Sequence, residues 1–295
     1  MPSPIPFDLP FYEACARNFA TRKLEKGYGA LLNNESRSDP DSFPRHYCEQ
    51  FAKSQIVSKL GTFRVDPRWP EWLIPGVFKK AQPLMTSSDL DLFDFSALGR
   101  YLMFKVQESL PPHVFINCGH EPLVLDTWAR SHWKDVKSLS NDFTAFDASQ
   151  TAEVLVLETL LMRHLNIPER FIEKYVELKM DLHTHSSSFA VMRFTGEWST
   201  FLFNTFMNLC WITARYDLHN EAIVLAGDDS SINGLPNERP DWKKLEPHLT
   251  LVGKPIVDER AEFCGWRICS KGIFREPTSL LLKMFAADAM DNLKE

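Results

Sequence analysis

From about residue 138 onward, apolar positions recur along the chain with two different periods. Short apolar runs bounded by turn residues predict strands, whereas longer stretches with apolar residues three and four positions apart predict helices. Strands are expected at 138–146, 189–194, 222–226, 252–257 and 262–268, and helices at 151–165, 169–180, 197–218 and 240–249. The first 80 residues contain many prolines, which interrupt helices, so element boundaries there are poorly defined. Because strands and helices alternate irregularly, the pattern predicts a mixed α and β fold.

The helix expected at 197–218 carries a polar stripe in an otherwise apolar sequence. Thr200 and Asn204 are four residues apart and therefore share one face, and Gly196 lies one turn earlier on the same line. Burying polar side chains among aromatic neighbours is unfavourable unless a ligand or a partner uses them. Two structural alternatives stay open: Thr195 can belong to the N-cap region of the helix, and Asn204 can be a buried amide with its hydrogen bonds satisfied.

A pair of acidic residues follows the apolar strand at 222–226. Asp228 and Asp229, which follow Gly227, have the setting of a hairpin turn, and two ionised carboxylates this close need either solvent or a cation. Because adjacent strand residues point to opposite faces, Asp228 is the better candidate for a direct metal ligand. Asp142 stands at another strand-to-turn junction, and carboxylate oxygens suit Mg²⁺. Two ions bridged by such aspartates support nucleotidyl transfer, and an exposed Asp-Asp turn is the alternative.

Composition and charge limit the class of protein. The 295 residues are 44% hydrophobic and 12% aromatic, which is enough for a core and excludes disordered and fibrous classes. No apolar run has the length of a membrane span, and the N-terminal residues lack a signal-peptide pattern, so we expect no transmembrane segment. The net charge is -6; residues 1–140 carry 17 basic and 16 acidic residues, and residues 141–295 carry 16 and 23. The segment 53–80 is basic and aromatic, which fits either a solvated face or a nucleic-acid contact.

Four strings in the second half resemble, in order, motifs A, B, C and E of the palm of viral RNA-dependent RNA polymerases. They are SNDFTAFDASQ, TGEWSTFLFNTFMN, AGDDS and FCGW. The similarity is greatest to the alphavirus-like supergroup, in particular to the Tymovirales, plant and fungal viruses with positive-strand genomes. The upstream segments 51–59, 79–82 and 110–119 also resemble that family, so the resemblance extends over roughly residues 51–282.

The resemblance implies an α+β, right-hand polymerase with an antiparallel palm sheet flanked by helices, helical or irregular fingers, and a short or missing thumb. Residues 1–135 would form a fingers-like N-terminal region that includes the basic nucleotide-entry segment. Residues 136–270 would form the palm with motifs A to E, and residues 271–295 a truncated start of the thumb.

The resemblance also assigns roles at the carboxylates and the polar stripe. Asp142 and Asp228 match the metal-binding aspartates, and Asp229 matches the supporting third carboxylate. Asp147 matches the aspartate that senses the ribose of the incoming nucleotide. Asn204 would join it in reading the 2′-hydroxyl, which can both donate and accept a hydrogen bond.

The resemblance implies further roles for residues that would contact the substrate around the carboxylates. Thr195 and Gly196 fall on the family's Ser-Gly loop, with threonine in place of serine, and Thr200 keeps the family's spacing. Lys254 stands where the family carries a lysine proposed to protonate the departing pyrophosphate; an ordinary surface lysine is the alternative. Four further cations would contact the triphosphate or are simply solvated charges: Lys53, Lys59, Lys80 and Arg100.

The implied function is RNA-directed RNA polymerisation, a nucleotidyl transfer of ribonucleotides during viral RNA replication. Mg²⁺, with Mn²⁺ as the alternative, is the implied cofactor. The implied partners are an RNA template and nascent strand, ribonucleoside triphosphates, and viral methyltransferase and helicase modules. The expected location is the host cytoplasm, at membrane-associated replication complexes reached through other parts of the replicase.

Two other functions stay open at this point. A reverse transcriptase or DNA polymerase would use the same metal chemistry but usually carries a bulky side chain where Asp147 stands. A non-catalytic RNA-binding remnant, or a fragment of a larger replicase, is suggested by the few residues that follow the expected palm.

Overall fold

The computed structural model describes residues 5–25, 89–183, 188–194 and 197–275, together with 277, 281 and 284. The chain divides into two compact units. The larger comprises Met1–Asp8, Gly99–Arg193 and Ser199–Glu295, and is called the sheet unit below. The smaller comprises Leu9–Leu98 and Phe194–Trp198.

The smaller unit contains helix α1 (Leu9–Glu25) and the first part of α4 (Asp89–Ser109), which enters the sheet unit at Gly99. Inside the smaller unit the ring of Phe95 stacks on that of Trp198, with centroids 5.0 Å apart and planes inclined by 7°. Phe95 is almost completely buried.

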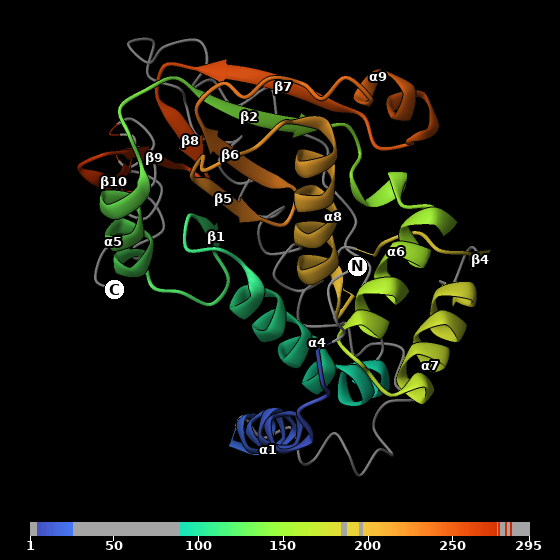
Figure 1. The fold of residues 1–295 in the computed structure, drawn as a ribbon. Coiled ribbons are helices and arrows are strands. Elements are labelled where there is room, and N and C mark those ends of the chain that lie inside the picture. The colour runs from blue at the N-terminus through green and yellow to red at the C-terminus, as the bar shows by residue number, and fades with distance from the viewer. Residues whose placement is uncertain are drawn as a thin grey trace, which may run out of the picture. The chain divides into compact units, whose positions relative to one another are not determined.

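The sheet unit is built on a five-stranded sheet (Figure 1). Its strands are β1 (Val114–Ile116), β2 (Ser138–Phe143), β5 (Ile223–Ala226), β6 (Asp229–Asn233) and β7 (Gly253–Asp258), in the spatial order β1-β5-β6-β2-β7. Only β1 pairs in parallel, with β5, and the other neighbours are antiparallel. The apolar run of β5 is buried because it lies in the interior of the sheet, whereas the edge strand β7 is mostly exposed.

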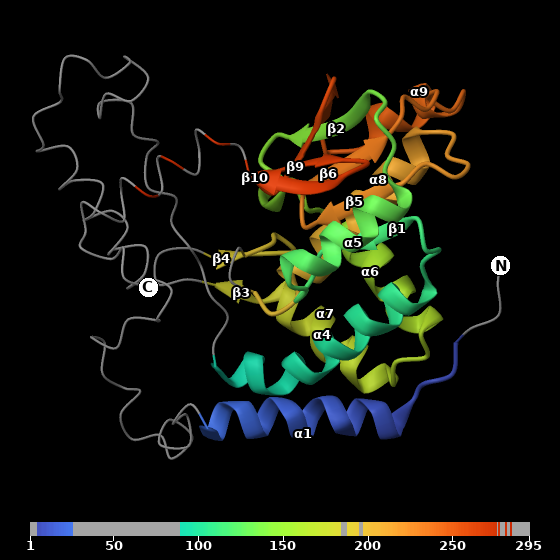
Figure 2. The same cartoon turned by 90° about the vertical axis from the view of Figure 1, so that its left-hand side faces the viewer.

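A second, three-stranded antiparallel sheet packs against helix α5 (Pro122–His132), as Figure 2 shows. Its strands are β8 (Ala261–Phe263), β9 (Trp266–Cys269) and β10 (Gly272–Arg275), in the order β10-β9-β8. Leu125 and Trp128 of α5 share one apolar core with Phe263 and Ile268 of this sheet. This core also includes Val224, so the two sheets are joined through buried side chains.

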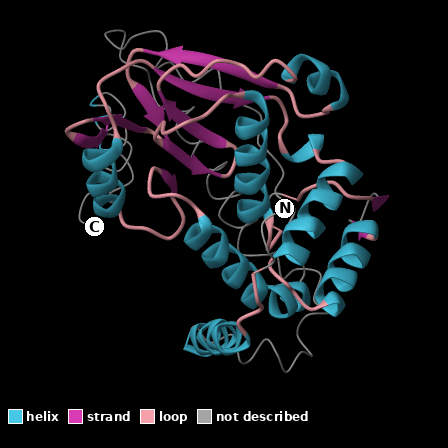
Figure 3. Cartoon of the chain, in the orientation of Figure 1, coloured by secondary structure: helices cyan, strands magenta, loops and turns pink. Residues whose placement is uncertain are grey.

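The sheet unit also contains helices, drawn in cyan in Figure 3, and one of them lies beside the central strands. They are α6 (Ala152–His164), α7 (Glu169–Met180), α8 (Thr200–Arg215) and α9 (Trp242–Leu245), with the short helical turns η3 (Asp147–Ser149) and η4 (Glu246–His248) and the two-residue strands β3 (Leu182–His183) and β4 (Ser188–Phe189). α8 contacts β5 and β6 directly. In the described part of the chain, every helix is too short or too polar to cross a membrane.

Most of the expected elements are confirmed, and the boundaries of four are wrong. The segment 138–146, expected as a strand that enters a turn, is a strand only to Phe143, and residues 144–146 form the turn. The strand expected at 189–194 ends at Phe189, because Val191 has a left-handed backbone (φ 66°) that interrupts extended pairing. The strand expected at 262–268 is a hairpin, since Cys264 and Gly265 (φ 50° and 71°) form a two-residue turn between β8 and β9. The helix expected at 197–218 is shorter and covers Thr200–Arg215.

The predicted division at residue 135 stays a prediction. The structure adds that β1 and α5, which precede residue 135, belong to the sheet unit.

Helix α8 holds the turn between β5 and β6. Gly227 and Asp228 form a two-residue turn in which Gly227 has φ 66°, a value that favours glycine at this position of a hairpin. The Gly227 N–H donates to Oγ1 of Thr205 (2.9 Å). Nδ2 of Asn208 donates to the carbonyls of Gly227 (3.2 Å) and Asp228 (2.9 Å). The helix therefore bonds to the backbone of the turn and not to the side chain of Asp228.

Substituting Asn208 tests whether these hydrogen bonds between α8 and the turn stabilise the fold. Asn208→Ala should lower the free energy of unfolding by about 1–3 kcal/mol, because one buried and one partly buried carbonyl group lose their donor. Urea denaturation measures the change. Thr213→Val is the matched control on the same helix, where an exposed hydroxyl bonds only to the helix backbone, and it should change stability by less than about 0.5 kcal/mol. Equal effects of the two substitutions would show that the hydrogen bonds of Asn208 to the turn do not stabilise the fold.

Gly253 fits between two aromatic rings. A Cβ atom at this position would lie 2.7 Å from Trp211 and 2.9 Å from Phe143. Gly253→Ala should therefore destabilise the fold by about 1–3 kcal/mol through overpacking, as measured by urea denaturation. Combining it with Trp211→Phe removes the nearest clashing atoms, so the double variant should lose less stability than the sum of the single variants. Strict additivity would show that the contact is not the cause.

Candidate active site

Asp142 and the Asp228 turn come from neighbouring strands of the central sheet. Strands β2 and β6 pair with Ser140 opposite Ser231, and continuing that antiparallel register by two residues brings Asp142 opposite Asp229. Asp228 stands at the tip of the adjoining β5–β6 turn. The same register places Asp142 and Asp229 on the face of the sheet that carries Ser140 and Ser231. The strand pairing therefore gathers three carboxylates at one end of the sheet.

The pKa of Asp228 is affected by the acidic groups near it. Its pKa is raised, first because neighbouring protein atoms keep water from the carboxyl group, even though the residue as a whole is exposed. The negative charges of Asp147, Asp229 and Asp142 raise the pKa further, in that order of size, whereas the residue's own backbone N–H opposes the shift. Three further carboxylates therefore lie near enough to Asp228 to disfavour its charged form.

The carboxylates are not arranged as a complete metal-binding site. Among the described residues, no group of three or more His, Cys, Asp or Glu side chains is arranged so that it could hold a metal ion. The acidic groups are thus close enough to repel one another, but they would have to draw together around a cation.

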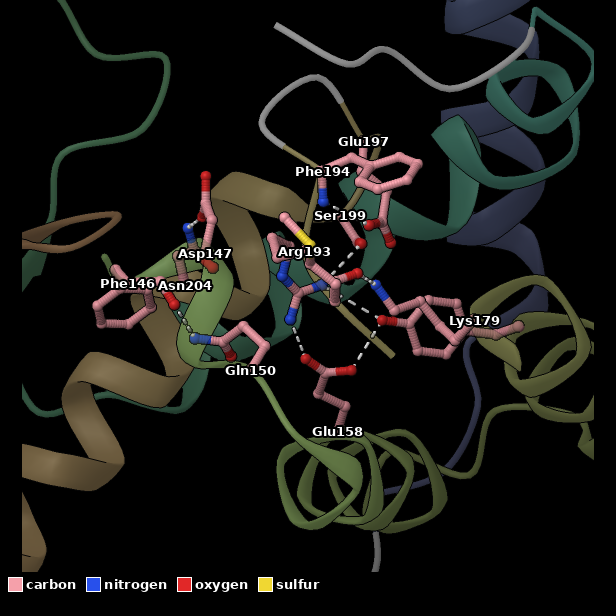
Figure 4. A network of polar contacts seen from close by, with 12 residues as sticks. Phe146, Asp147, Gln150, Glu158, Lys179, Arg193, Phe194, Glu197, Ser199 and Asn204 are labelled. Atoms are coloured by element: carbon pink, nitrogen blue, oxygen red, sulfur yellow. Dashed lines mark hydrogen bonds and ion pairs between the residues drawn. The ribbon is translucent and has the colours of Figure 1, made fainter. Parts of the chain in front are cut away.

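Asp147 and Asn204 form a direct pair (Figure 4). Nδ2 of Asn204, from α8, donates to Oδ1 of Asp147 over 2.8 Å. Asn204 is 6% exposed, and its own Oδ1 accepts no hydrogen bond from the described residues. A buried amide oxygen without a donor is unfavourable, which makes this atom a candidate acceptor for a ligand hydroxyl. The alternative of a fully satisfied buried amide is therefore wrong within the described residues.

Asp229 joins the central sheet to the β8–β9 hairpin. Its Oδ2 accepts a hydrogen bond from the N–H of Cys264 over 2.7 Å, at the turn of the hairpin. The pKa of the Cys264 thiol is raised to about 12, first by its shielding from water and then by the charge of Asp229. One carboxylate oxygen of Asp229 is thus committed to a neutral donor.

Lys254 lies directly opposite Asp142 in the pairing of β2 with β7. Residues opposite each other in an antiparallel pair project from the same face, so the ammonium group and the carboxylate share one side of the sheet. Lys254 is exposed. Its neighbour Gly253 is packed between Trp211 and Phe143, which fixes where the strand begins.

The remaining predicted site residues are not brought into this group. Thr200 begins α8 one turn before Asn204 and is partly buried, and Arg100 lies exposed on α4. Their predicted contacts with substrate stay predictions. Five others lie outside the described residues: Lys53, Lys59, Lys80, Thr195 and Gly196.

The sequence did not reveal the residues that support the site by contacting the turn and the helix that carry it. Asn208 continues the four-residue spacing of Thr200 and Asn204, so the same stripe could have revealed it. Thr205 lies outside the stripe, and no sequence signal singled it out. Arg193 and Glu158 form a buried ion pair that links the segment before α8 to α6, and a separation of 35 residues gives no local pattern for such a contact.

Comparison with known proteins gives the family. The family described as RNA dependent RNA polymerase matches residues 78–294. The RNA replication protein of Potato virus X is 33% identical over 299 residues, covering 99% of this chain and 20% of that protein. The RNA replication protein of Botrytis virus F is 35% identical over 276 residues, covering 93% of this chain and 14% of that protein. The chain thus spans about a fifth or less of the length of these relatives.

A further relative and one solved structure complete the comparison. The RNA replication protein of Strawberry mild yellow edge-associated virus is 33% identical over 97% of this chain and 21% of its own length. The crystal structure of an insertion loop deletion mutant of the RNA-dependent RNA polymerase of a human picorbirnavirus has a TM-score of 0.49 and 10% identity, over 73% of this chain and 51% of that one. On the match over residues 78–294, the chain belongs to the viral RNA-dependent RNA polymerase family of the Tymovirales type.

Proposed function

We propose that this chain catalyses the template-directed addition of ribonucleotides to RNA during viral RNA replication. The observation that carries the proposal is the gathering of Asp142, Asp228 and Asp229 at one end of the sheet, beside the pair formed by Asp147 and Asn204. Carboxylates that repel one another suit a divalent cation, and a polar pair with an open acceptor suits a sugar hydroxyl. Family membership supports the same reaction.

The donor set fits Mg²⁺, with Mn²⁺ as the alternative. Asp142 and Asp228 would be the direct ligands, and Asp229 would support them. Their mutual repulsion is the physical reason for the fit, because a cation would turn an unfavourable arrangement into a favourable one. Bound there, the ions would supply activation of the attacking hydroxyl and charge neutralisation of the departing pyrophosphate.

Asp147 and Asn204 would select ribose. A 2′-hydroxyl both donates and accepts, so it can give its proton to Oδ1 of Asn204, whereas a deoxyribose leaves that buried oxygen without a partner. The small side chain of Asp147 leaves room for the hydroxyl, which favours a ribonucleotide polymerase over a reverse transcriptase or DNA polymerase. Thr195, Gly196 and Thr200 would border the same sugar.

Lys254 would serve as the general acid. Its place opposite Asp142 puts an ammonium group on the face where the pyrophosphate would leave, within the reach of a long side chain. The cations Lys53, Lys59, Lys80 and Arg100 would attract the triphosphate. The RNA template and nascent strand complete the substrates.

Further replicase parts are proposed as partners. The relatives are named RNA replication proteins and are about five times longer than this chain, so methyltransferase and helicase modules are the partners we propose. We place the protein in the host cytoplasm, at replication complexes on membranes that other modules contact.

Replacing Asp228 tests the reaction. Asp228→Ala should reduce incorporation of labelled ribonucleotide on an RNA template to background, because a metal ligand is lost, while circular dichroism shows an unchanged fold. Asp241→Ala is the control, since Asp241 is an exposed carboxylate that pairs with Lys244 away from the site. Activity retained in Asp228→Ala would refute the site, and stable folding with RNA binding but no incorporation by the unaltered chain would favour a non-catalytic remnant.

Cation binding can be measured without catalysis. Mg²⁺ should raise the thermal unfolding midpoint of the unaltered chain, with a stabilisation of about 1.4 kcal/mol when its concentration is ten times its Kd. Thermal scans at matched ionic strength should show a smaller rise for the double variant Asp142→Asn/Asp228→Asn and the full rise for Asp241→Asn. The same rise in all three proteins would place the bound cation elsewhere.

A further inference from the structure

A buried ion pair inside the sheet unit links α6 to the segment that precedes α8 (Figure 4). Nη2 of Arg193 bonds to Oε1 of Glu158, and the two side chains are only 1% and 2% exposed. The hydroxyl of Tyr175, from α7, donates to the other oxygen of Glu158 over 2.7 Å. Buried ion pairs are often no more stabilising than apolar residues of similar volume. Stability alone therefore does not explain why this ion pair is present.

The guanidinium of Arg193 contacts the first turn of α8. Its Nη1 donates to Oγ of Ser199 (3.2 Å), the residue at the N-cap of the helix. Its Cζ lies 5.4 Å from the centre of the Phe203 ring, which sits one residue before Asn204. The side chain of Arg193 thus fixes the end of α8 that carries Asn204.

The backbone of Arg193 contacts the other partner of the polar pair. Its N–H donates to the carbonyl of Asp147 over 3.2 Å. Asp147 also begins the segment that continues into α6, where Glu158 holds Arg193. Arg193 therefore closes a ring of contacts: it binds Asp147 through its backbone and α8 through its side chain, and Asn204 of α8 binds Asp147.

We propose that Arg193, anchored by Glu158, is a positioning residue that sets the separation of Asp147 and Asn204 and thereby the preference for ribose over deoxyribose. The inference rests on the proposed function, because it deepens the sugar-reading role of that pair. Arg193 is buried behind the pair and acts through it. If its side chain is replaced, the first turn of α8 can shift away from Asp147, so the 2′-hydroxyl loses well-placed partners. A deoxyribonucleotide makes no such contact and should bind as before.

The test compares ribonucleotide with deoxyribonucleotide in the full 295-residue chain. The double variant Arg193→Met/Glu158→Met replaces the ion pair by apolar groups and leaves no unpaired charge. Arg193→Lys is the milder second variant, which keeps the charge and loses the planar fork. Arg215→Met is the matched control, because Arg215 is also a largely buried arginine paired with a glutamate, at the opposite end of α8. Circular dichroism verifies that each variant is folded.

Two measurements are made on each protein. The first is the ratio of kcat/KM for ATP over dATP on an RNA template, and the second is the equilibrium affinity for GTP over dGTP, which needs no turnover. Both Arg193 variants should lower these ratios by about three- to tenfold, the loss of one well-placed hydrogen bond, mainly through a higher KM for the ribonucleotide. Arg215→Met should keep the ratios of the unaltered chain even where its stability falls.

Every outcome of these measurements either supports or overturns the inference. Folded Arg193 variants that lose activity equally toward both sugars would overturn the inference and leave the proposed function standing, since Arg193 would then be structural only. Ratios equally lowered in Arg215→Met would also overturn it. An unaltered chain that binds neither nucleotide, or that prefers deoxyribose, would contradict the proposed function and the inference with it.

Discussion

The repulsion among four acidic side chains at one end of a sheet is the constraint on which this structure depends. Asp147, Asp229 and Asp142 disfavour the ionised form of Asp228, whose pKa is raised first by its shielding from water and then by their charges. The backbone must therefore be held by other contacts. The turn that carries Asp228 is held through its carbonyls and its N–H by Asn208 and Thr205, which bond to the backbone of the turn and not to the carboxylate.

Two of the four carboxylates accept hydrogen bonds from neutral donors in other parts of the sheet unit. Asp147 accepts from the amide of Asn204, and Asp229 accepts from the N–H of Cys264. A neutral donor orients a carboxylate without cancelling its charge, so the site keeps the negative potential that a divalent cation needs. The same bonds also connect separate parts of the sheet unit, since one leads to α8 and the other to the β8–β9 hairpin.

Helix α8 acts as the common support. Over two turns it presents Asn204 to Asp147, then Thr205 and Asn208 to the turn between β5 and β6. Because an α-helix is rigid over this length, the distance from the sugar-reading pair to the turn is set by the helix itself. The position of the helix in turn depends on its first residues, where Arg193 contacts Ser199 and Phe203.

Much of this arrangement could be predicted from the sequence, because its strongest signals are local. The apolar run before Gly227 predicts the strand and the turn, and the spacing of Thr200 and Asn204 predicts their shared face. What could not be predicted depends on partners far apart in sequence. The contact of Arg193 with Glu158 spans 35 residues, and that of Asp229 with Cys264 also spans 35. The strand expected at 189–194 failed because the left-handed backbone of Val191 is imposed by its surroundings, since valine has no preference for it.

The convergence of the acidic residues is most directly tested by anomalous X-ray diffraction from crystals of this chain soaked in Mn²⁺. We expect anomalous density between the carboxylates of Asp142 and Asp228, with Asp229 turned toward it and Asp147 still bonded to Asn204. Density at other carboxylates while this group remains empty at saturating Mn²⁺, or a refined structure in which Asp142 and Asp228 face different sides of the sheet, would contradict it.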